Sequence, residues 1–290
     1  MNTIRLVTLA AIWGASFLFM RMGAPHFGVV PLIALRVAIA AVLLAPELRD
    51  AGARREFRTH WRPLAVVGVT NSALPFCLLT FAALSLTAGV DSILNATTPL
   101  WTAIVAFVWL RTPMKRQQAA GLALGFVGVL ILAGGELGHG GTLPAVAAAL
   151  LATLSYGFAG NYSKRTLSQV RPFVSAFGSQ LFAAVVLVPA AIPLWPAGPL
   201  APLDWLSVAL LGTVCTALAY LLYFRLIQDA GAQYAASVTF LIPVFGLVWG
   251  AIFLREAITV QAVAGCAVIL LGTALATGKL GGRLPLASRR

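Results

Sequence analysis

Apolar residues are gathered along this chain into ten long stretches, which short polar segments separate. A bilayer core about 30 Å thick calls for about 20 apolar residues per α-helix, and each stretch comes close to that length. The pattern therefore predicts an all-α integral membrane protein of ten spanning helices, without a sizeable domain outside the membrane. The predicted helices cover residues 4–22, 29–48, 64–84, 89–110, 118–135, 143–163, 172–194, 205–228, 233–254 and 259–279.

The second half of the chain repeats the first at an offset of 144 residues. Gly and Pro constrain the backbone, so their recurrence indicates a repeated structure rather than a shared composition. The matched pairs are Trp61 and Trp205, Gly68 and Gly212, Pro99 and Pro243, Leu110-Arg111 and Leu254-Arg255, Gln117 and Gln261, Gly121 and Gly265, and Gly128 and Gly272. We expect two repeats of five helices, residues 1–135 and 143–279, followed by a basic cytoplasmic tail at 280–290.

Composition agrees with a membrane protein. Hydrophobic residues make up 60% of the chain and charged residues only 10%, with a mean hydropathy of +0.93. A soluble domain of this length does not need so much apolar surface. The first stretch follows Met1 closely and lacks an A-x-A cleavage pattern, so we expect a retained helix rather than a signal peptide.

The positive charges predict the orientation. The net charge is +12, and with the N-terminus in the cytoplasm 17 basic residues fall inside, against Arg21 and Arg255 outside. Both termini are therefore expected to be cytoplasmic. Each half holds five helices, an odd number, so the second half is expected to insert upside down relative to the first. Because topology explains the basic loops, we expect the lipid bilayer and no nucleic acid as a partner.

No pattern typical of catalysis is present. The chain has no HExxH, GxSxG or phosphate-loop motif. The three cysteines fall in apolar stretches, at spacings typical of neither metal sites nor disulfides. We therefore predict no catalytic residues, no metal, no cofactor and no enzymatic activity. A membrane enzyme and a receptor without transport stay alternatives. Formation of a product would indicate the enzyme, and binding of a ligand without flux would indicate the receptor.

Several short motifs resemble a known family. The chain is similar to the drug/metabolite transporter superfamily, in its EamA branch, over residues 4–279. The matching features are Trp13-Gly14-Ala15-Ser16-Phe17, Arg36 in the second predicted helix, Leu254-Arg255-Glu256 followed by Gln261 and Gly265, and Leu110-Arg111 followed by Gln117 and Gly121. One departure is Thr112-Pro113, where the family usually has a Glu.

The resemblance implies a carrier of the bacterial inner membrane. It implies two inverted repeats around a central cavity, lined mainly by helices one, three, four, six, eight and nine, and alternating access. Within the branch, the chain is most similar to bacterial amino-acid exporters, including aromatic ones. We therefore expect export of amino acids, aromatic and other neutral ones among them, or of similar small metabolites. A drug or quaternary-ammonium exporter, with or without proton coupling, is the alternative.

Polar and aromatic residues near the middle of repeat-related helices are the candidate substrate site. Amides and hydroxyls can bind the charged groups of a zwitterion, and rings can hold its side chain. The candidates are Trp13, Asn71, Ser72, Phe76, Asn95, Thr98, Trp101, Tyr156, Thr216 and Tyr220. Ordinary packing of the rings, or hydroxyls bonded to their own helix, is the alternative. Pro99 and Pro243 are expected to kink their helices beside the cavity, or else only to shape packing.

Arg36 is the one ionisable residue that we place well inside a predicted helix. It is expected either to contact a substrate carboxylate or to be structural. All acidic residues fall at helix ends or in loops, which predicts no membrane-embedded carboxylate and leaves His26 as a faint candidate for a proton relay. We therefore expect facilitated movement, with proton exchange as the alternative.

Small residues mark two further helices as closely packed. Gly121, Gly125 and Gly128 share a face, and Gly265 and Gly272 repeat the pattern. The sequence leaves open whether this packing lies within one chain or between protomers. The oligomeric state is likewise open, and a monomer is compatible with the sequence.

Overall fold

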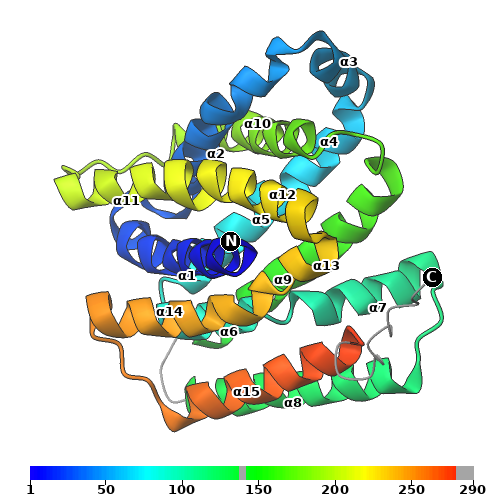
Figure 1. The fold of residues 1–290 in the computed structure, drawn as a ribbon. Coiled ribbons are helices and arrows are strands. Elements are labelled where there is room, and N and C mark those ends of the chain that lie inside the picture. The colour runs from blue at the N-terminus through cyan, green and yellow to red at the C-terminus, as the bar shows by residue number, and fades with distance from the viewer. Residues whose placement is uncertain (137–141, 279–290) are drawn as a thin grey trace.

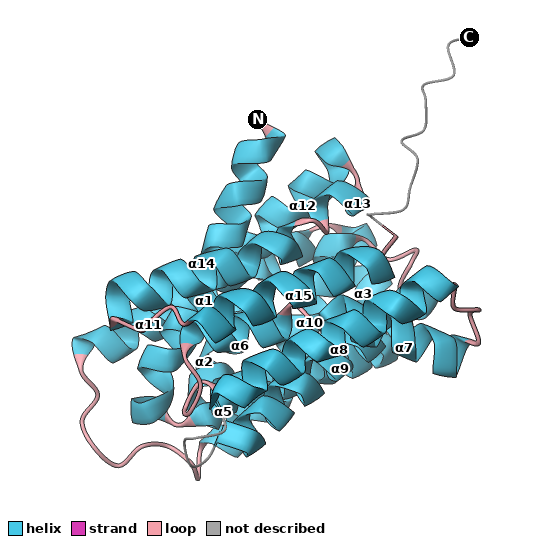
Figure 2. Cartoon of the chain, turned by 90° about the horizontal axis from the view of Figure 1, so that it is seen from below, coloured by secondary structure: helices cyan, strands magenta, loops and turns pink. Residues whose placement is uncertain are grey.

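The apolar stretches of the sequence form α-helices, because a helix satisfies its own backbone N–H and C=O groups in hydrocarbon. The structure is a computed structural model that describes residues 1–136 and 142–278, and these residues form helices and loops without a strand (Figure 2). The predicted basic tail at 280–290 lies outside the described residues.

The first half of the chain contains helices that follow the predicted stretches closely (Figure 1). They are α1 (Asn2–Phe27), α2 (Val29–Leu44) with a 3-10 turn η1 (Ala45–Arg49), α3 (Ala51–Thr59), α4 (Trp61–Gly68), η2 (Val69–Ala73), α5 (Leu74–Ala82), α6 (Ala88–Asn95), α7 (Thr98–Leu110) and α8 (Arg116–Glu136).

The second half contains a similar series. Its elements are α9 (Thr142–Thr166), α10 (Pro172–Ala191), α11 (Pro202–Gly212), η3 (Thr213–Leu218), α12 (Ala219–Ala230), α13 (Ala232–Ala235), α14 (Val238–Leu254) and α15 (Val260–Ala276). Within the described residues, eight helical stretches are long and apolar enough to cross a membrane, and α2 and α15 are shorter apolar helices.

Two irregular features recur at the sequence offset of 144 residues. The π-helical segments η2 and η3 begin at Val69 and Thr213 and interrupt the third and eighth predicted helices. The residues that end α7 and α14, Arg111 and Arg255, both adopt the left-handed conformation, with φ of 52° and 56°. Non-glycine residues rarely take this conformation, so its recurrence indicates a shared backbone structure in the two halves.

The predicted helices that contain the repeat-related prolines, Pro99 and Pro243, are each interrupted before the proline. The break between α6 and α7 is at residues 96–97, and Pro99 is in the first turn of α7, where its missing N–H costs little. In the second half the break is at residues 236–237, between α13 and α14, and α14 continues through Pro243. The helices thus break two and six residues before Pro99 and Pro243, and the kinks expected at these prolines stay a prediction.

The small-residue faces pack two helices of the same chain together. Helices α8 and α15 lie side by side (Figures 1 and 2). A Cβ on Gly128 would come within 2.7 Å of the backbone nitrogen of Ile269, and one on Gly272 would overlap the backbone of Gly125. The predicted close packing is therefore confirmed as a contact within the chain.

A short helix occupies the arginine-rich segment that was expected to be a loop. Asp50 accepts a hydrogen bond from the backbone N–H of Ala53 and so caps α3. The ring of Phe57 packs on Phe177 and Phe182 of α10, with centroid distances of 5.6 and 5.9 Å. An amphipathic helix thus lies across one end of the bundle.

Candidate functional site

A central cavity of about 620 Å³ lies among the helices of both halves. Residues of α1, η2, α5, α6, α7, α9, η3, α12 and α14 line it, as the prediction of a central cavity requires, and α2 and α10 add further residues. Its lining is mostly apolar or aromatic, with neutral polar groups between the rings. Such a composition is typical of small-molecule sites.

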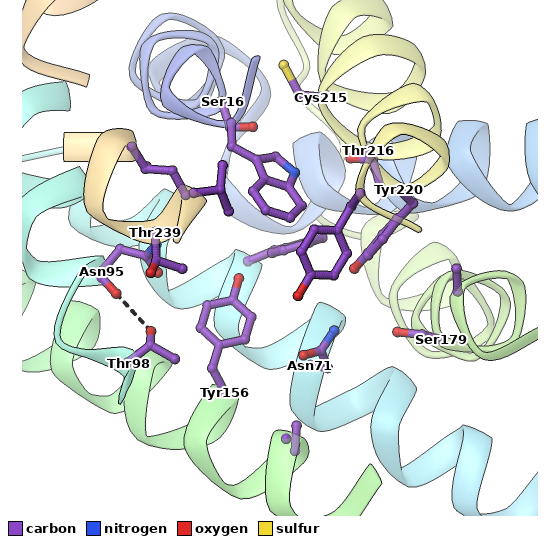
Figure 3. A pocket seen from close by; sticks show the side chains of 18 of the residues that line it. Ser16, Asn71, Asn95, Thr98, Tyr156, Ser179, Cys215, Thr216, Tyr220 and Thr239 are labelled. Atoms are coloured by element: carbon purple, nitrogen blue, oxygen red, sulfur yellow. Dashed lines mark hydrogen bonds between the residues drawn. The ribbon is translucent and has the colours of Figure 1, made fainter. Parts of the chain in front are cut away.

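Most of the predicted site residues face this cavity. Trp13, Asn71, Phe76, Asn95, Thr98, Tyr156, Thr216, Tyr220 and Arg36 all line it. In Figure 3, Asn71, Tyr156 and Tyr220 point into the same space from three different elements. The ring of Trp13 lies 5.3 Å from that of Tyr223, centroid to centroid.

Ser72 and Trp101 do not line the cavity, which corrects their predicted positions. The hydroxyl of Ser72 is fully buried, 2.7 Å from the hydroxyl of Ser179, and accepts a hydrogen bond from Gln180. Trp101 turns away and packs edge to face on Phe126 of α8, at a centroid distance of 5.2 Å. Both residues flank cavity residues in sequence, and the rotation of the helix places their side chains elsewhere.

The π-helical segments place polar groups beside the cavity. A π turn adds a residue to the helix and leaves backbone carbonyls without their usual partners, which is common at functional sites. In η3, the hydroxyl of Thr216 donates to the carbonyl of Leu211, five residues earlier. In η2, the carbonyl of Thr70 accepts a hydrogen bond from Ser155 of α9. The irregular backbone is thus held by side chains from its own and the opposite half.

Arg36 is the charged residue of the lining, and its side chain is almost fully buried. Nε donates to the hydroxyl of Thr216 over 3.0 Å, and Nη1 lies 3.6 Å from the sulfur of Met20. The guanidinium lies over the ring of Phe76, with Cζ 3.8 Å from the centroid. None of the carboxylates whose side chains the structure describes forms an ion pair with it.

The contact between Arg36 and Thr216 has a counterpart in the other half. At the offset of 144 residues, Arg36 corresponds to Gln180 and Thr216 to Ser72. Gln180 donates to the hydroxyl of Ser72 over 3.0 Å, as Arg36 does to Thr216. In each case a polar side chain of one half donates to the π segment of the other half. The two halves therefore exchange equivalent hydrogen bonds.

Sequence reasoning missed several residues of the lining. Ser16, Ser179, Cys215 and Thr239 also face the cavity, whereas Tyr223, which lines it too, shares the helical spacing of Thr216 and Tyr220 in the sequence. Ser179 lies beside Gln180, the repeat counterpart of Arg36. The repeat could therefore have indicated Ser179. For Ser16 and Thr239, no comparable signal exists in the sequence.

Asp91 lies at a helix end, as expected of the acidic residues, but it is buried inside the protein, which the sequence did not indicate. It lies in the first turn of α6 and is 0% exposed. Both carboxylate oxygens are buried without a hydrogen-bond partner among the described residues. Asp91 is one helical turn from the cavity residue Asn95 and interacts electrostatically with Tyr156. His26, in contrast, is exposed, and its Nδ1 lies 2.8 Å from the buried carboxylate of Asp204.

The cavity reaches toward the end of the bundle at which α1 begins. Arg5 in the first turn of α1 pairs with Asp229 near the end of α12. The lining at this end includes Ser163 in the last turn of α9 and Thr239 in the first turn of α14. At the other end of the bundle, the lining on α1 stops at Met20. The cavity is thus asymmetric along the bundle.

Charged contacts fix α3 at the same end as the N-terminus. Arg171, before α10, donates to Asp50 over 2.6 Å and to Glu56 over 2.9 Å. These hydrogen bonds hold the pKa of the Asp50 carboxyl below its ordinary value and raise the pKa of Arg171. The pair is exposed, so its contribution to stability is expected to be small.

Comparison with known proteins gives matches over both halves of the chain. The model of the EamA-like transporter family matches residues 3–134 and 143–278. An uncharacterized transporter of Bacillus subtilis is 25% identical, covering 96% of this chain and 92% of that protein. A probable terminal-alkyne amino-acid exporter of Streptantibioticus cattleyicolor is 25% identical, with 96% and 94% covered.

A probable amino-acid metabolite efflux pump of Salmonella typhimurium is 26% identical over 91% of this chain and 90% of that protein. A solved crystal structure has the same fold, with a TM-score of 0.68 at 19% identity, covering 98% of this chain and 99% of that one.

Proposed function

The chain belongs to the EamA-like transporter family and is a multi-pass membrane transporter, not an enzyme; from this premise we propose that it exports amino acids, aromatic and other neutral ones among them, or similar small metabolites. The names of two relatives, an amino-acid exporter and an amino-acid metabolite efflux pump, support this substrate class. Transport is facilitative in this proposal, so the substrate's own gradient sets its direction.

The observation that carries the proposal is the cavity between the two halves. Its volume of about 620 Å³ lies within the range of small-molecule sites, about 300–1,000 Å³. Rings, amides, hydroxyls and one guanidinium line it, so it offers partners both to the charged groups of an amino acid and to an apolar side chain. The substrate-binding residues that we propose are the predicted candidates that line the cavity, without Ser72 and Trp101.

We place the chain in a bacterial inner membrane with ten spanning helices and both termini in the cytoplasm. The five helical stretches of each half form two inverted repeats in this proposal. The exchanged hydrogen bonds, from Arg36 to Thr216 and from Gln180 to Ser72, support a two-fold relation between the halves. Labelling of intact cells tests the orientation: a cysteine at Gly198 should react with an impermeant reagent, and one at Arg58 should not.

The asymmetric cavity supports alternating access, the mechanism proposed for such repeats. The cavity reaches the end that we assign to the cytoplasm, so this conformation would load substrate from inside the cell. If each half adopted the conformation that the other half has here, the cavity would open at the opposite end. The π segments and the breaks at residues 96–97 and 236–237 are the irregular points at which the helices can bend.

Proton coupling is the second candidate mode, and Asp91 is the observation that favours it. Buried acidic residues in membrane segments commonly belong to proton pathways. The two unpartnered oxygens of Asp91 lie one turn from the cavity residue Asn95. In this mode, flux would depend on a pH gradient and Asp91→Asn would remove that dependence.

Binding to the purified protein tests the substrate class. A ligand that binds the folded state raises the unfolding temperature, so a panel of neutral and aromatic amino acids should raise it and a quaternary ammonium compound should not. Gly160 lines the cavity and has free space around it, so Gly160→Trp should fill the cavity and abolish the shift. Gly134 also has free space but lies away from the cavity, so Gly134→Trp is the matched control. A shift with the ammonium compound alone would favour the drug-export alternative.

A further inference from the structure

We propose that Arg36 binds the carboxylate of the substrate, so that the cavity takes carboxylate-bearing molecules and rejects cations. The inference rests on the proposed function and goes beyond it, because it states which chemical group the site requires. It also assigns an orientation: the carboxylate lies beside Phe76 and Thr216. The side chain of the substrate lies among Trp13, Tyr156 and Tyr220.

The guanidinium of Arg36 has hydrogen-bonding capacity left over. Of its five N–H groups, Nε–H donates to Thr216, and an Nη1–H is directed at the weakly accepting sulfur of Met20. Nη2 donates no hydrogen bond within the described part of the chain. A guanidinium is planar, so the remaining donors lie in the plane of the group, while Cζ lies 3.8 Å from the centroid of Phe76. Donors arranged in this way match the two oxygens of a carboxylate.

The charge of Arg36 is not compensated by the groups that face it. Arg36 is 4% exposed, and the titratable side chains that interact with it are Tyr156, Tyr220 and Cys215, all ordinarily neutral. Asp91, on α6, interacts with Tyr156 but forms no ion pair with Arg36. A buried charge without a partner is costly. A bound carboxylate would supply the missing partner, whereas a cation would add a second uncompensated charge.

The repeat counterpart of Arg36 shows that its structural contact does not need a charge. Gln180 makes the equivalent hydrogen bond to Ser72 with a neutral amide, and Gln180 does not line the cavity. The bond to the opposite π segment is therefore available to a glutamine. The charged guanidinium is present only in the first half, where the side chain lines the cavity. From this difference between Arg36 and Gln180 we infer that the charge of Arg36 serves to bind a ligand.

A set of four related ligands tests the inference on the wild-type protein. Phenylalanine carries both charges, phenylalaninamide lacks the carboxylate, 3-phenylpropionate lacks the ammonium and phenethylamine carries the ammonium alone. Each is measured as a competitor of labelled phenylalanine binding. We expect phenylalanine to bind about tenfold to a hundredfold more tightly than its amide, the range for a hydrogen bond to a charged group. Phenylpropionate should compete better than phenethylamine.

Arg36→Gln should reduce the preference for phenylalanine over the amide to about twofold or less, since glutamine can keep the bond to Thr216. Gln180→Leu is the matched control, at the corresponding position but away from the cavity, and should keep the wild-type ratio even if it lowers stability. Arg36→Lys keeps the charge and should retain part of the preference, which provides a measurement if the glutamine variant fails to fold.

Equal binding of phenylalanine and its amide by the wild type, or an unchanged ratio in Arg36→Gln and Arg36→Lys, would overturn the assignment. Neither result would overturn the proposed function, because amino acids would still bind. Absence of binding by every amino acid tested would instead contradict the proposed function, and the inference with it.

Discussion

At the scale of single residues, two tryptophans with similar positions in their helices differ in role: Trp13 lines the cavity, and Trp101 packs against another helix. Both were expected at the site from their mid-helix positions. The structure places Trp13 against Tyr223 in the cavity, and Trp101 against Phe126 on the far side of α7. The two residues therefore make a matched pair for substitution.

We expect Trp13→Ala to weaken substrate binding about tenfold or more, because it removes a large apolar surface from the cavity. Trp101→Phe keeps a ring against Phe126 and should leave binding unchanged. Dissociation constants of the two purified variants check this, with thermal unfolding as the control for folding. Weak binding by Trp101→Phe alongside normal binding by Trp13→Ala would reverse the two assignments.

Some residues of the site could be predicted from the sequence, and others could not. Arg36, Tyr156 and Thr216 could be predicted, because polar or aromatic residues in apolar stretches are few and the repeat relates their positions. Ser72 and Asp91 could not be placed correctly. The orientation of Ser72 depends on the π turn in η2, and the burial of Asp91 depends on the packing of α6 against its neighbours. Neither property is visible in the order of residues.

At the scale of elements, the helices were predictable and their irregularities were not. The ten apolar stretches all contain helices, since length and hydropathy are properties of the sequence. The helix α3 was missed because its arginines suggested a loop, although Ala53 and Phe57 form an apolar side. The breaks at residues 96–97 and 236–237 lie at different distances before Pro99 and Pro243, so the two proline positions alone do not locate them.

The α8–α15 contact leads to a prediction about stability. A methyl group on Gly272 would overlap the backbone of Gly125, so Gly272→Ala should destabilise the protein by about 1–3 kcal/mol despite the higher helix propensity of alanine. Gly134 has no neighbour within 4 Å, so Gly134→Ala should be neutral or slightly stabilising. Thermal unfolding in detergent measures both. Equal stability of the two variants would show that α8 and α15 are not in close contact.

The attachment of α3 should depend on pH. The pKa of Asp50 is held below its ordinary value of 3.8 by Arg171, so the contact stabilises the folded state above that value and is lost as the pH falls through the lowered pKa. Arg171→Gln should therefore lower the unfolding temperature slightly at neutral pH, and by less near about pH 3.

Arg55→Gln is the control for this experiment, since Arg55 is an exposed arginine of α3 without an ion pair in the described part of the chain. It should change little at either pH. A difference between wild type and Arg171→Gln that grows on acidification would contradict the assigned contact.

At the scale of the whole molecule, the two halves combine similar backbones with different chemistry. The π segments, the left-handed residues and the exchanged hydrogen bonds recur at the same offset. The charge does not recur, because Arg36 corresponds to the neutral Gln180. A repeated backbone suits a carrier that exposes one site to each side in turn. In our proposal, the charge of Arg36 lets that site distinguish carboxylates from cations.

Flux of labelled amino acids into liposomes that contain the purified protein, with and without an imposed pH gradient, tests whether the central cavity is a facilitative transport site. We predict that unlabelled amino acid loaded inside will drive uptake of labelled phenylalanine without a pH gradient. We also predict that Gly160→Trp will abolish this exchange and Gly134→Trp will retain it. Exchange that needs the gradient and disappears in Asp91→Asn would replace facilitated movement with proton coupling. Undiminished exchange by Gly160→Trp would contradict the claim that the central cavity is the transport site.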